Sequence, residues 1–421
     1  MVDLLSQHLK FRNRLVATSR LLLIHWVMMT REALRLLDLP WDLVLEILSR
    51  VPATSLGRLS FTCKRWNALF KDHEFIKKHL DKAAKQCMVL MSGNSRKVYS
   101  MNVNLDGIHD NFVDPQTLLN LKKFHSPKQF NIYNIFHCDG LLLCITWGVR
   151  LVVWNPCTGQ IRWIPFCGRY KDHTEFALGY ENNKSCQTYK ILRSSWDFYA
   201  AQPQDVDCGI YDFESHSWKD LNDVFPNSCR KLLSKAVSLK GNIYWVANKN
   251  DEEDFLLSFD FSTEKYTCLS ISFSSDDGDF VPTTLSVVRE ERLAVLYSSY
   301  SHPTKIEIWM TTHDKIDQAR LVSWSKFLSL ELDENNPQID LSTDITFFID
   351  EEKKAAVLCD VEYFNKRDMG MVYIVGEDNR FMKIPVGTNS SGPVIYNYVP
   401  SLVQIQQGGV MTRERKRKNR H

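Results

Sequence analysis

The chain has 421 residues, of which 44% are hydrophobic, 24% charged and 12% aromatic, and its formal net charge is +2. This composition excludes a wholly disordered chain, and the length predicts two domains or a repeat array. The near-neutral charge excludes a general attraction to nucleic acid or to an anionic membrane, so we expect neither as a direct partner.

The cysteines and the N-terminal segment bear on localisation. The 11 cysteines are scattered, and none are spaced as C-x-x-C, which indicates reduced thiols in the cytoplasm or nucleus. The apolar run at residues 21–29 has only about half the length of a bilayer span. Basic residues precede it, so a signal peptide or an organellar presequence is the alternative interpretation. We treat residues 1–35 as an extension without an assigned role.

The pattern becomes helical from Asp38 onward. Pro40 suits the first turn of a helix, and Pro52 ends this helix and begins a second one. A unit of about 40 residues with apolar side chains on more than one helix face cannot bury all of them internally. We therefore expect part of this surface to contact a partner, or else the rest of the same chain. Apolar residues recur at steps of three and four in the first segment, at Leu39, Leu43, Val44, Ile47, Leu48 and Val51. The second segment carries Leu56 and Leu59, and the third carries Cys63 and Trp66.

Residues 36–80 resemble an F-box, on the strength of Leu39-Pro40-Trp41-Asp42-Leu43-Val44-Leu45-Glu46-Ile47-Leu48-Ser49-Arg50-Val51-Pro52, Leu56 and Cys63-Lys64-Arg65-Trp66-Asn67. In that family the motif is a three-helix module that docks on a Skp-type adaptor, which bridges to a cullin and a RING subunit. The resemblance implies a non-catalytic subunit of a ubiquitin ligase. It also implies adaptor-binding roles for Leu39, Pro40, Leu43, Val44, Ile47, Leu48, Val51, Pro52, Leu56, Leu59, Cys63 and Trp66.

Residues 81–86 are polar, and we interpret them as a linker. Beyond them the periodicity changes to short β-rich runs separated by turn residues, with turns expected at Asp139-Gly140, Thr158-Gly159 and Lys240-Gly241-Asn242. The expected strands are residues 88–91, 98–103, 141–146, 151–154, 243–246, 256–261, 293–297, 306–309, 355–359 and 372–375.

Residues 87–405 carry a long internal repeat. Large apolar or aromatic residues before a polar turn recur at separations of 53, 57, 48, 50 and 64 residues. This is near the kelch period of about 50, in which each repeat makes one four-stranded blade. We therefore predict an α+β multidomain protein with a large all-β propeller of about six blades; a pair of β-sandwiches is the alternative. The marker residues are Met101, Trp154, Tyr211, Phe259, Trp309 and Tyr373.

The same region is similar to the plant F-box-associated domain. The similarity rests chiefly on His137-Cys138-Asp139-Gly140-Leu141-Leu142-Leu143-Cys144 and Leu151-Val152-Val153-Trp154-Asn155-Pro156-Cys157-Thr158-Gly159-Gln160. Shorter matches follow at residues 241–247, 257–261, 322–327 and 398–402. In that family the domain presents a face that recruits target proteins and has no fixed catalytic residues.

Metal and catalytic sites find little support in the sequence. His137 and Cys138, with Cys144 six residues on, lack the second ligand pair of a zinc site, and strand alternation places both thiols on one face, as in a core. The acidic stretches 251–254 and 276–279 lack the ligand spacing of a calcium loop. No nucleotide-binding loop, nucleophile elbow or metalloprotease motif is present. We expect no catalytic residues, no metal and no cofactor.

The C-terminal tail, residues 406–421, is basic. Its six positive charges indicate a nuclear localisation signal; phosphate binding and a simple solvated tail are the alternatives. We therefore expect the protein in the nucleus and the cytoplasm. The residues concerned are Arg413, Arg415, Lys416, Arg417, Lys418 and Arg420.

Together these features predict the substrate-recognition subunit of a Skp–cullin–F-box ubiquitin ligase. The F-box would bind the Skp-type adaptor, and the β domain would bind a target protein that the sequence does not identify. The alternative is an F-box protein that acts outside the ligase as a sequestering or scaffold adaptor.

Overall fold

The computed structural model of the chain divides into two compact units, residues 1–86 and 87–421. In the first unit it describes residues 40–83, which we call the helical unit. In the second it describes residues 88–93, 97–103, 113–118, 132–146, 150–166, 173–182, 187–196, 206–221, 224–249, 253–271, 280–299, 305–312, 316, 321–331, 341–342, 345–364, 367–377, 379–388 and 394–405.

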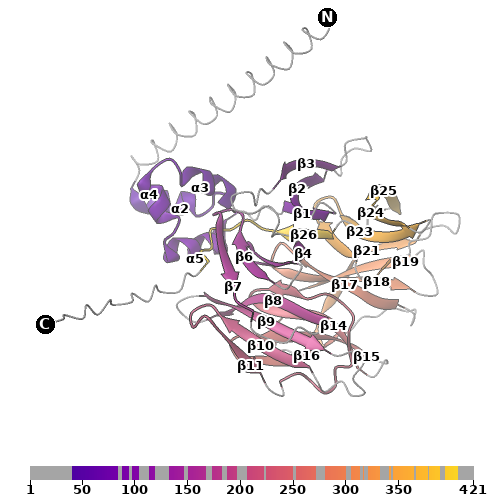
Figure 1. Cartoon of the computed structure of the whole chain (residues 1–421). Helices are drawn as coiled ribbons and strands as arrows, with labels where there is room; N and C mark the ends of the chain where they lie inside the picture. Colours follow the sequence, from indigo (N-terminus) through magenta and orange to yellow (C-terminus); the bar gives the residue numbers. More distant parts are fainter. Residues whose placement is uncertain are drawn as a thin grey trace, which may run out of the picture. The chain divides into compact units, whose positions relative to one another are not determined.

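The helical unit has four helices within residues 40–83, labelled in Figure 1. They are α2 (Trp41–Leu48), α3 (Ala53–Leu59), α4 (Lys64–Leu69) and α5 (His73–Lys82). Pro40 and Pro52 directly precede α2 and α3, as expected. The helix α5 adds to the predicted three, and it continues to Lys82, into the stretch that we interpreted as a linker. Asp72 starts α5, because its Oδ1 accepts a hydrogen bond from the Phe75 amide at 3.0 Å.

Apolar side chains from all four helices fill the core of this unit. Val44, Leu48, Leu56, Trp66 and Phe75 are almost completely buried. Consecutive aromatic ring contacts link α2, α4 and α5. The ring centroids are 6.1 Å apart for Trp41–Trp66, 6.0 Å for Trp66–Phe70 and 5.6 Å for Phe70–Phe75. Offset ring contacts of this kind add to the stabilisation from burial. The apolar spacing that predicts the helices therefore also supplies their mutual packing.

The second unit consists of six sheets in its described part, and we call them blades 1 to 6. Blade 1 is β26 (Val394–Tyr398), β1 (Met88–Gly93), β2 (Lys97–Val103) and β3 (Val113–Leu118); blade 2 is β4 (Ile132–Cys138), β5 (Leu141–Thr146), β6 (Leu151–Asn155) and β7 (Gln160–Ile164). Blade 3 is β8 (His173–Asn182), β9 (Gln187–Trp196), β10 (Asp207–Asp212) and β11 (Ser217–Leu221).

Blade 4 is larger than the others in the described residues. It contains β12 (Lys231–Leu232), β13 (Val237–Leu239), β14 (Asn242–Lys249), β15 (Glu253–Asp260), β16 (Lys265–Ile271) and β20 (Leu321–Val322), which pairs parallel to β16. Blade 5 is β17 (Phe280–Val288), β18 (Arg292–Ser299), β19 (Lys305–Thr311) and β21 (Trp324–Glu331); blade 6 is β22 (Thr346–Asp350), β23 (Ala355–Phe364), β24 (Arg367–Gly376) and β25 (Arg380–Thr388).

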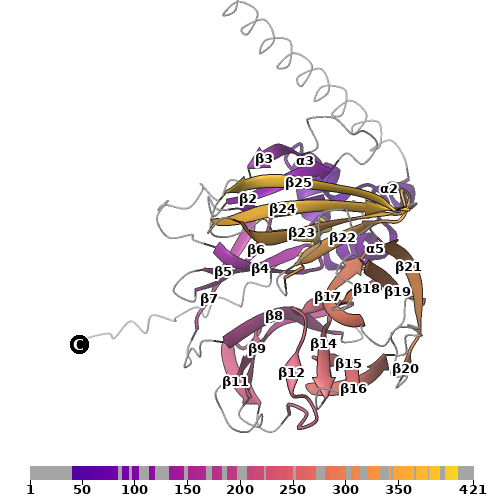
Figure 2. The same ribbon diagram turned by 90° about the vertical axis from the view of Figure 1, so that its right-hand side faces the viewer.

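The six blades close into a ring through their inner strands. Each inner strand contacts the inner strand of the next blade, in the order β4, β8, β13, β17, β22 and β26. The last of these, β26, contacts β4 and so completes the ring. Figure 2 shows the blades arranged around a common centre. The predicted propeller of about six blades is therefore confirmed, and the alternative of two sandwiches is excluded. Every marker residue of the repeat lies on the third strand of its blade: Met101 on β2, Trp154 on β6, Tyr211 on β10, Phe259 on β15, Trp309 on β19 and Tyr373 on β24.

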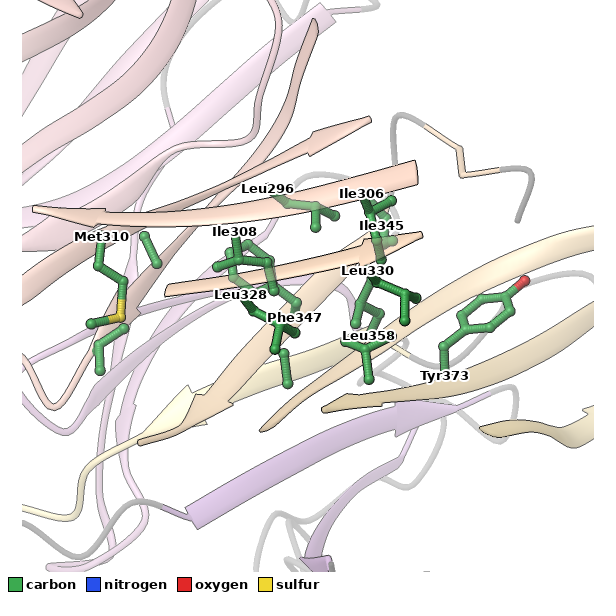
Figure 3. Close-up of a cluster of buried hydrophobic side chains, with 14 of the residues drawn as sticks. Leu296, Ile306, Ile308, Met310, Leu328, Leu330, Ile345, Phe347, Leu358 and Tyr373 are labelled. Atoms are coloured by element: carbon green, nitrogen blue, oxygen red, sulfur yellow. The ribbon is translucent and has the colours of Figure 1, made fainter. Parts of the chain in front are cut away.

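Neighbouring blades share their hydrophobic cores. One buried cluster joins blades 5 and 6, and Figure 3 shows Ile308, Leu328 and Phe347 packed between their strands. A second cluster joins blades 4 and 5 around Leu256 and Val295. A third places Tyr398 of β26 against blade 2. Because each of these cores is built from two blades, the blades that form them do not bury their apolar faces alone.

The ring is closed twice by the end of the chain. First, β26 pairs antiparallel with β1. Second, residues 399–405, which we call the closing segment, bind blade 2. The Nδ2 of Asn155 donates hydrogen bonds to the carbonyl oxygens of Ser401 at 3.1 Å and Val403 at 2.8 Å. The Ile405 amide donates to Oε1 of Gln160 at 2.8 Å. The closing segment therefore fixes blade 1 to blade 2.

The F-box-associated sequence signature contributes directly to this closure. Asn155 is fully buried, and its Oδ1 also accepts hydrogen bonds from the amides of Cys157 and Thr158, which shapes the turn before Gly159. Gly140 has a φ of +76°, and a Cβ at this position would lie 2.4 Å from Oγ of Ser401. Only glycine fits a positive φ so close to another segment.

Candidate functional site

Exposed apolar side chains are concentrated in the helical unit. Among the described residues, the large hydrophobic side chains with high exposure are Leu43 (52%), Ile47 (42%), Phe61 (87%) and Trp163 (41%). The first three belong to the helical unit. A small protein surface that exposes several large apolar side chains is typical of a binding site for another protein.

The helix α2 has two apolar faces, and the fold buries only one of them. Val44 and Leu48 lie in the core at 0% and 1% exposure. Leu43 and Ile47 are one helical turn apart and therefore share the other, exposed face. The exposed Pro40 lies at the N-terminus of this face. The apolar residues that the unit does not bury, Pro40, Leu43 and Ile47, therefore form an exposed apolar stripe on α2.

The predicted adaptor-binding residues divide by burial. Leu39 lies outside the described residues. The helix-surface group is Pro40, Leu43 and Ile47, which are exposed. An intermediate group, Val51, Pro52 and Cys63, is half-buried, and the Sγ of Cys63 accepts the Trp66 amide at 3.4 Å to start α4. The remaining five, Val44, Leu48, Leu56, Leu59 and Trp66, are buried in the unit's own core, where they support the exposed face from below.

The exposed Phe61 was not anticipated from the sequence. It lies between α3 and α4, where the helical period is interrupted, so the period does not predict whether its side chain is buried or exposed. The only available sequence signal was a large aromatic residue between the polar Ser60 and Thr62.

Charged side chains join α2 to α5. Glu46 forms ion pairs at 2.8 Å with Arg50, Lys78 and Lys82. Hydrogen bonds from Lys78, Lys82 and Arg50 hold the pKa of Glu46 well below its ordinary value. Because these groups are largely in contact with water, their interaction contributes little to stability, and we read it as orienting α2.

A buried histidine fixes α5 against the end of α2. His79 is 2% exposed, and its Nε2 donates a hydrogen bond to the carbonyl oxygen of Val51 at 2.8 Å. Burial lowers the pKa of His79, and the hydrogen bond to Val51 opposes this shift. The neutral ring therefore satisfies a carbonyl group beyond the end of α2 while keeping an apolar face toward Phe75.

The candidate metal residues of blade 2 serve packing and turn formation. The Nε2 of His137 accepts a hydrogen bond from the Gly140 amide at 3.0 Å, and the His137 ring packs edge-on against Tyr398. Cys138 and Cys144 are buried, and burial raises the pKa of Cys144 to about 12. The described residues include no group of three or more His, Cys, Asp or Glu side chains arranged to hold a metal ion.

We predict that His137 makes the stability of the protein depend on pH. Burial lowers the pKa of His137 to about 4, whereas the unfolded chain keeps the ordinary value near 6.5. Between these values the unfolded state binds more protons, so the free energy of unfolding rises with pH from 4 to 6.5 and falls on acidification. The shift alone corresponds to roughly 3 kcal/mol. Oε1 of Glu290 lies 3.6 Å from Nε2 of His137 and would stabilise the protonated ring, so the loss of stability on acidification should be smaller than this figure.

The matched variant is His137→Gln, which keeps an acceptor for the Gly140 amide and does not titrate. Chemical denaturation at pH 4.5, 5.5, 6.5 and 7.5 should show a smaller loss of stability for the variant than for the wild type. Equal losses in the two proteins would contradict the role of His137.

Other sequence hypotheses fall outside the described residues. They include the basic tail and the acidic stretch 276–279. The described helices include none that is long and apolar enough to cross a membrane.

Comparison with known proteins identifies both units. The F-box domain family matches residues 36–78, and the F-box associated beta propeller domain family matches residues 88–405. Arabidopsis thaliana contains similar proteins over nearly their whole length. "Putative F-box protein At3g17500" is 47% identical over 393 residues, covering 91% of this chain and 99% of the relative. "F-box/kelch-repeat protein At3g17530" is 43% identical over 382 residues, covering 88% and 95%.

Solved structures are more distant. The chain is 12% identical to TolB from Acinetobacter baumannii, with a TM-score of 0.38 over 73% of this chain and 65% of that one, a similarity too low to inform function. The family matches and the Arabidopsis relatives instead cover most of the sequence. The chain therefore belongs to the family of F-box proteins that carry an F-box associated β-propeller domain.

Proposed function

We propose that this protein is the substrate-recognition subunit of a Skp–cullin–F-box ubiquitin ligase. The observation that carries the proposal is the apolar stripe of α2. Three of the four highly exposed large hydrophobic side chains among the described residues lie within residues 40–83. Leu43 and Ile47 among them occupy positions of the F-box motif, so the stripe supplies the surface that a Skp-type adaptor would cover.

The mechanism is positional. The adaptor, with its cullin and RING partners, would hold the helical unit, and the propeller would hold a target protein. Tethering raises the effective concentration of the target's lysines near the ubiquitin carrier, so the chain needs no catalytic residues of its own. The propeller suits this role because its shared cores make a rigid support for the loops that would contact a target.

Reconstitution tests the proposal. The full chain should co-purify with a Skp-type adaptor, whereas a chain lacking residues 40–83 should not. With cullin, RING subunit, ubiquitin and the upstream enzymes added, the bound complex should transfer ubiquitin to proteins captured by the propeller. In cells with proteasome activity blocked, the proteins captured by the full chain should be compared with those captured by the chain lacking residues 40–83. Adaptor binding without any transfer would instead favour a sequestering adaptor that acts outside the ligase.

We further propose that the basic tail directs nuclear import, a prediction that rests on its sequence alone. Residues 406–421 fused to a fluorescent cargo protein should concentrate the cargo in nuclei. Replacing Arg415, Lys416, Arg417 and Lys418 with alanine removes most of the positive charge that an import receptor would bind, so the cargo should disperse. Identical distributions of the two fusions, measured by quantitative imaging, would contradict a role of the tail in nuclear import.

A further inference from the structure

The turn between α3 and α4 presents an aromatic side chain to solvent. Phe61 is 87% exposed, the highest value among the large hydrophobic residues with described side chains. The turn on either side of it is held by hydrogen bonds, from the Phe61 amide to the Arg58 carbonyl at 3.3 Å and from the Thr62 amide and hydroxyl to the Leu59 carbonyl at 2.9 and 2.7 Å. Phe61 is therefore presented by an ordered turn, which lowers the entropy lost when a partner binds.

The helix that follows this turn contacts the start of α2. The Trp41 ring at the start of α2 stacks on Trp66 at 6.1 Å, and the Arg65 guanidinium lies 3.9 Å above the Trp41 ring. Arg65 and Trp66 belong to the first turn of α4, which follows Phe61 within five residues. Phe61 therefore lies shortly before the helix whose first turn contacts the N-terminal end of α2, where Pro40 is also exposed.

The chain on either side of Phe61 is mainly basic. Arg58, Lys64 and Arg65 are exposed on the chain that flanks the turn, and Asp42 is the exposed acid in the first turn of α2. An apolar side chain with a basic rim matches an apolar pocket with an acidic rim on the partner. The three basic residues would also favour the approach of an acidic surface at low ionic strength.

We propose that Phe61 is a second anchor for the Skp-type adaptor, inserting into an apolar, acid-rimmed pocket next to the surface that covers Leu43 and Ile47. This inference rests on the proposed function, because the pocket that would receive Phe61 belongs to the same partner. Aromatic side chains contribute disproportionately to protein interfaces when a partner pocket excludes water from them.

The experiment measures adaptor affinity by calorimetry for the full-length wild type, Phe61→Ala, Phe61→Leu, the double variant Leu43→Ala and Ile47→Ala, and the control Lys77→Ala on the exposed surface of α5. We expect Phe61→Ala to weaken binding at least tenfold, Phe61→Leu to recover most of the loss, and Lys77→Ala to bind as the wild type does. The melting temperature of the free protein should stay unchanged in Phe61→Ala, since the removed ring is exposed. Added salt should weaken binding by the wild type.

The outcomes separate this inference from the proposed function. If Phe61→Ala binds like the wild type while the double variant does not, the second anchor is wrong and the ligase role stands. If the wild type itself fails to bind any Skp-type adaptor, both are wrong. A lower melting temperature in Phe61→Ala without loss of affinity would show that the ring packs within its own chain, which also overturns the anchor.

Discussion

Replacing Leu43 and Ile47 together with aspartate is expected to abolish binding to a Skp-type adaptor while leaving the helical unit folded. Both side chains are substantially exposed, at 52% and 42%, so the change leaves the core of the free protein intact. In the complex it would place two carboxylates in an apolar interface. Losing two interface anchors at about 2 kcal/mol each predicts an affinity loss of roughly a thousandfold.

The choice of positions matters for this test. Substituting Val44 or Leu48 would also stop adaptor binding, but by removing core side chains that are 0% and 1% exposed, and such a loss would be uninformative. Lys77→Asp introduces the same side chain at an exposed position of α5 and should bind normally. Affinity should be measured by calorimetry and folding by circular dichroism. Wild-type affinity in the double aspartate variant would contradict the assignment of α2 as the adaptor-binding face.

Removing residues 394–421 is expected to prevent the propeller from folding stably. The truncation removes β26, which pairs with β1, and the closing segment, which binds blade 2. Val399, Leu402, Val403 and Ile405 are all buried in this segment. At about 1.5–3 kcal/mol for each buried side chain, their loss alone approaches the total stability of a typical domain.

The matched control removes only residues 406–421, which follow the last residue of the closing segment. This shorter truncation should melt cooperatively near the wild-type temperature and resist protease. The longer truncation should lose the cooperative transition while still binding the adaptor, because the helical unit has a buried core of its own. A cooperative, protease-resistant propeller without residues 394–421 would show that ring closure is dispensable.

Local signals explain why much of the fold could be predicted. Trp154, Tyr211 and Phe259 each occupy the last position but one of a third strand, just before a polar turn. This arrangement recurs because each blade packs against its neighbours in the same way. The turns after these strands share an Asn or Asp whose Oδ1 accepts amide hydrogen bonds, as at Asp212 and Asp260. A repeat of strand, aromatic residue and turn is therefore visible without any knowledge of tertiary contacts.

The features that escaped prediction depend on distant contacts or on interrupted periodicity. Asn155 was recognisable as part of a family signature, but its hydrogen bond to Val403 spans 248 positions, and no local pattern reports it. In the polar helix α5, the buried face consists of Phe75, Ile76 and His79, and His79 contacts the carbonyl oxygen of Val51, which lies 28 positions earlier in the chain. Phe61 lies outside any helix, so the helical period says nothing about its exposure.

The pairing of the first and last strands of the propeller has a consequence for its synthesis. Because β1 pairs with β26, blade 1 stays incomplete until residues 394–398 have left the ribosome. At usual elongation rates the 94–393 stretch takes roughly 15–60 s to make, during which the edge of β1 has no native partner and is open to wrong pairing. The helical unit, in contrast, has all its residues available from the beginning. A nascent or prematurely terminated chain would therefore occupy an adaptor before it was able to hold a target, and so compete with finished copies for the ligase.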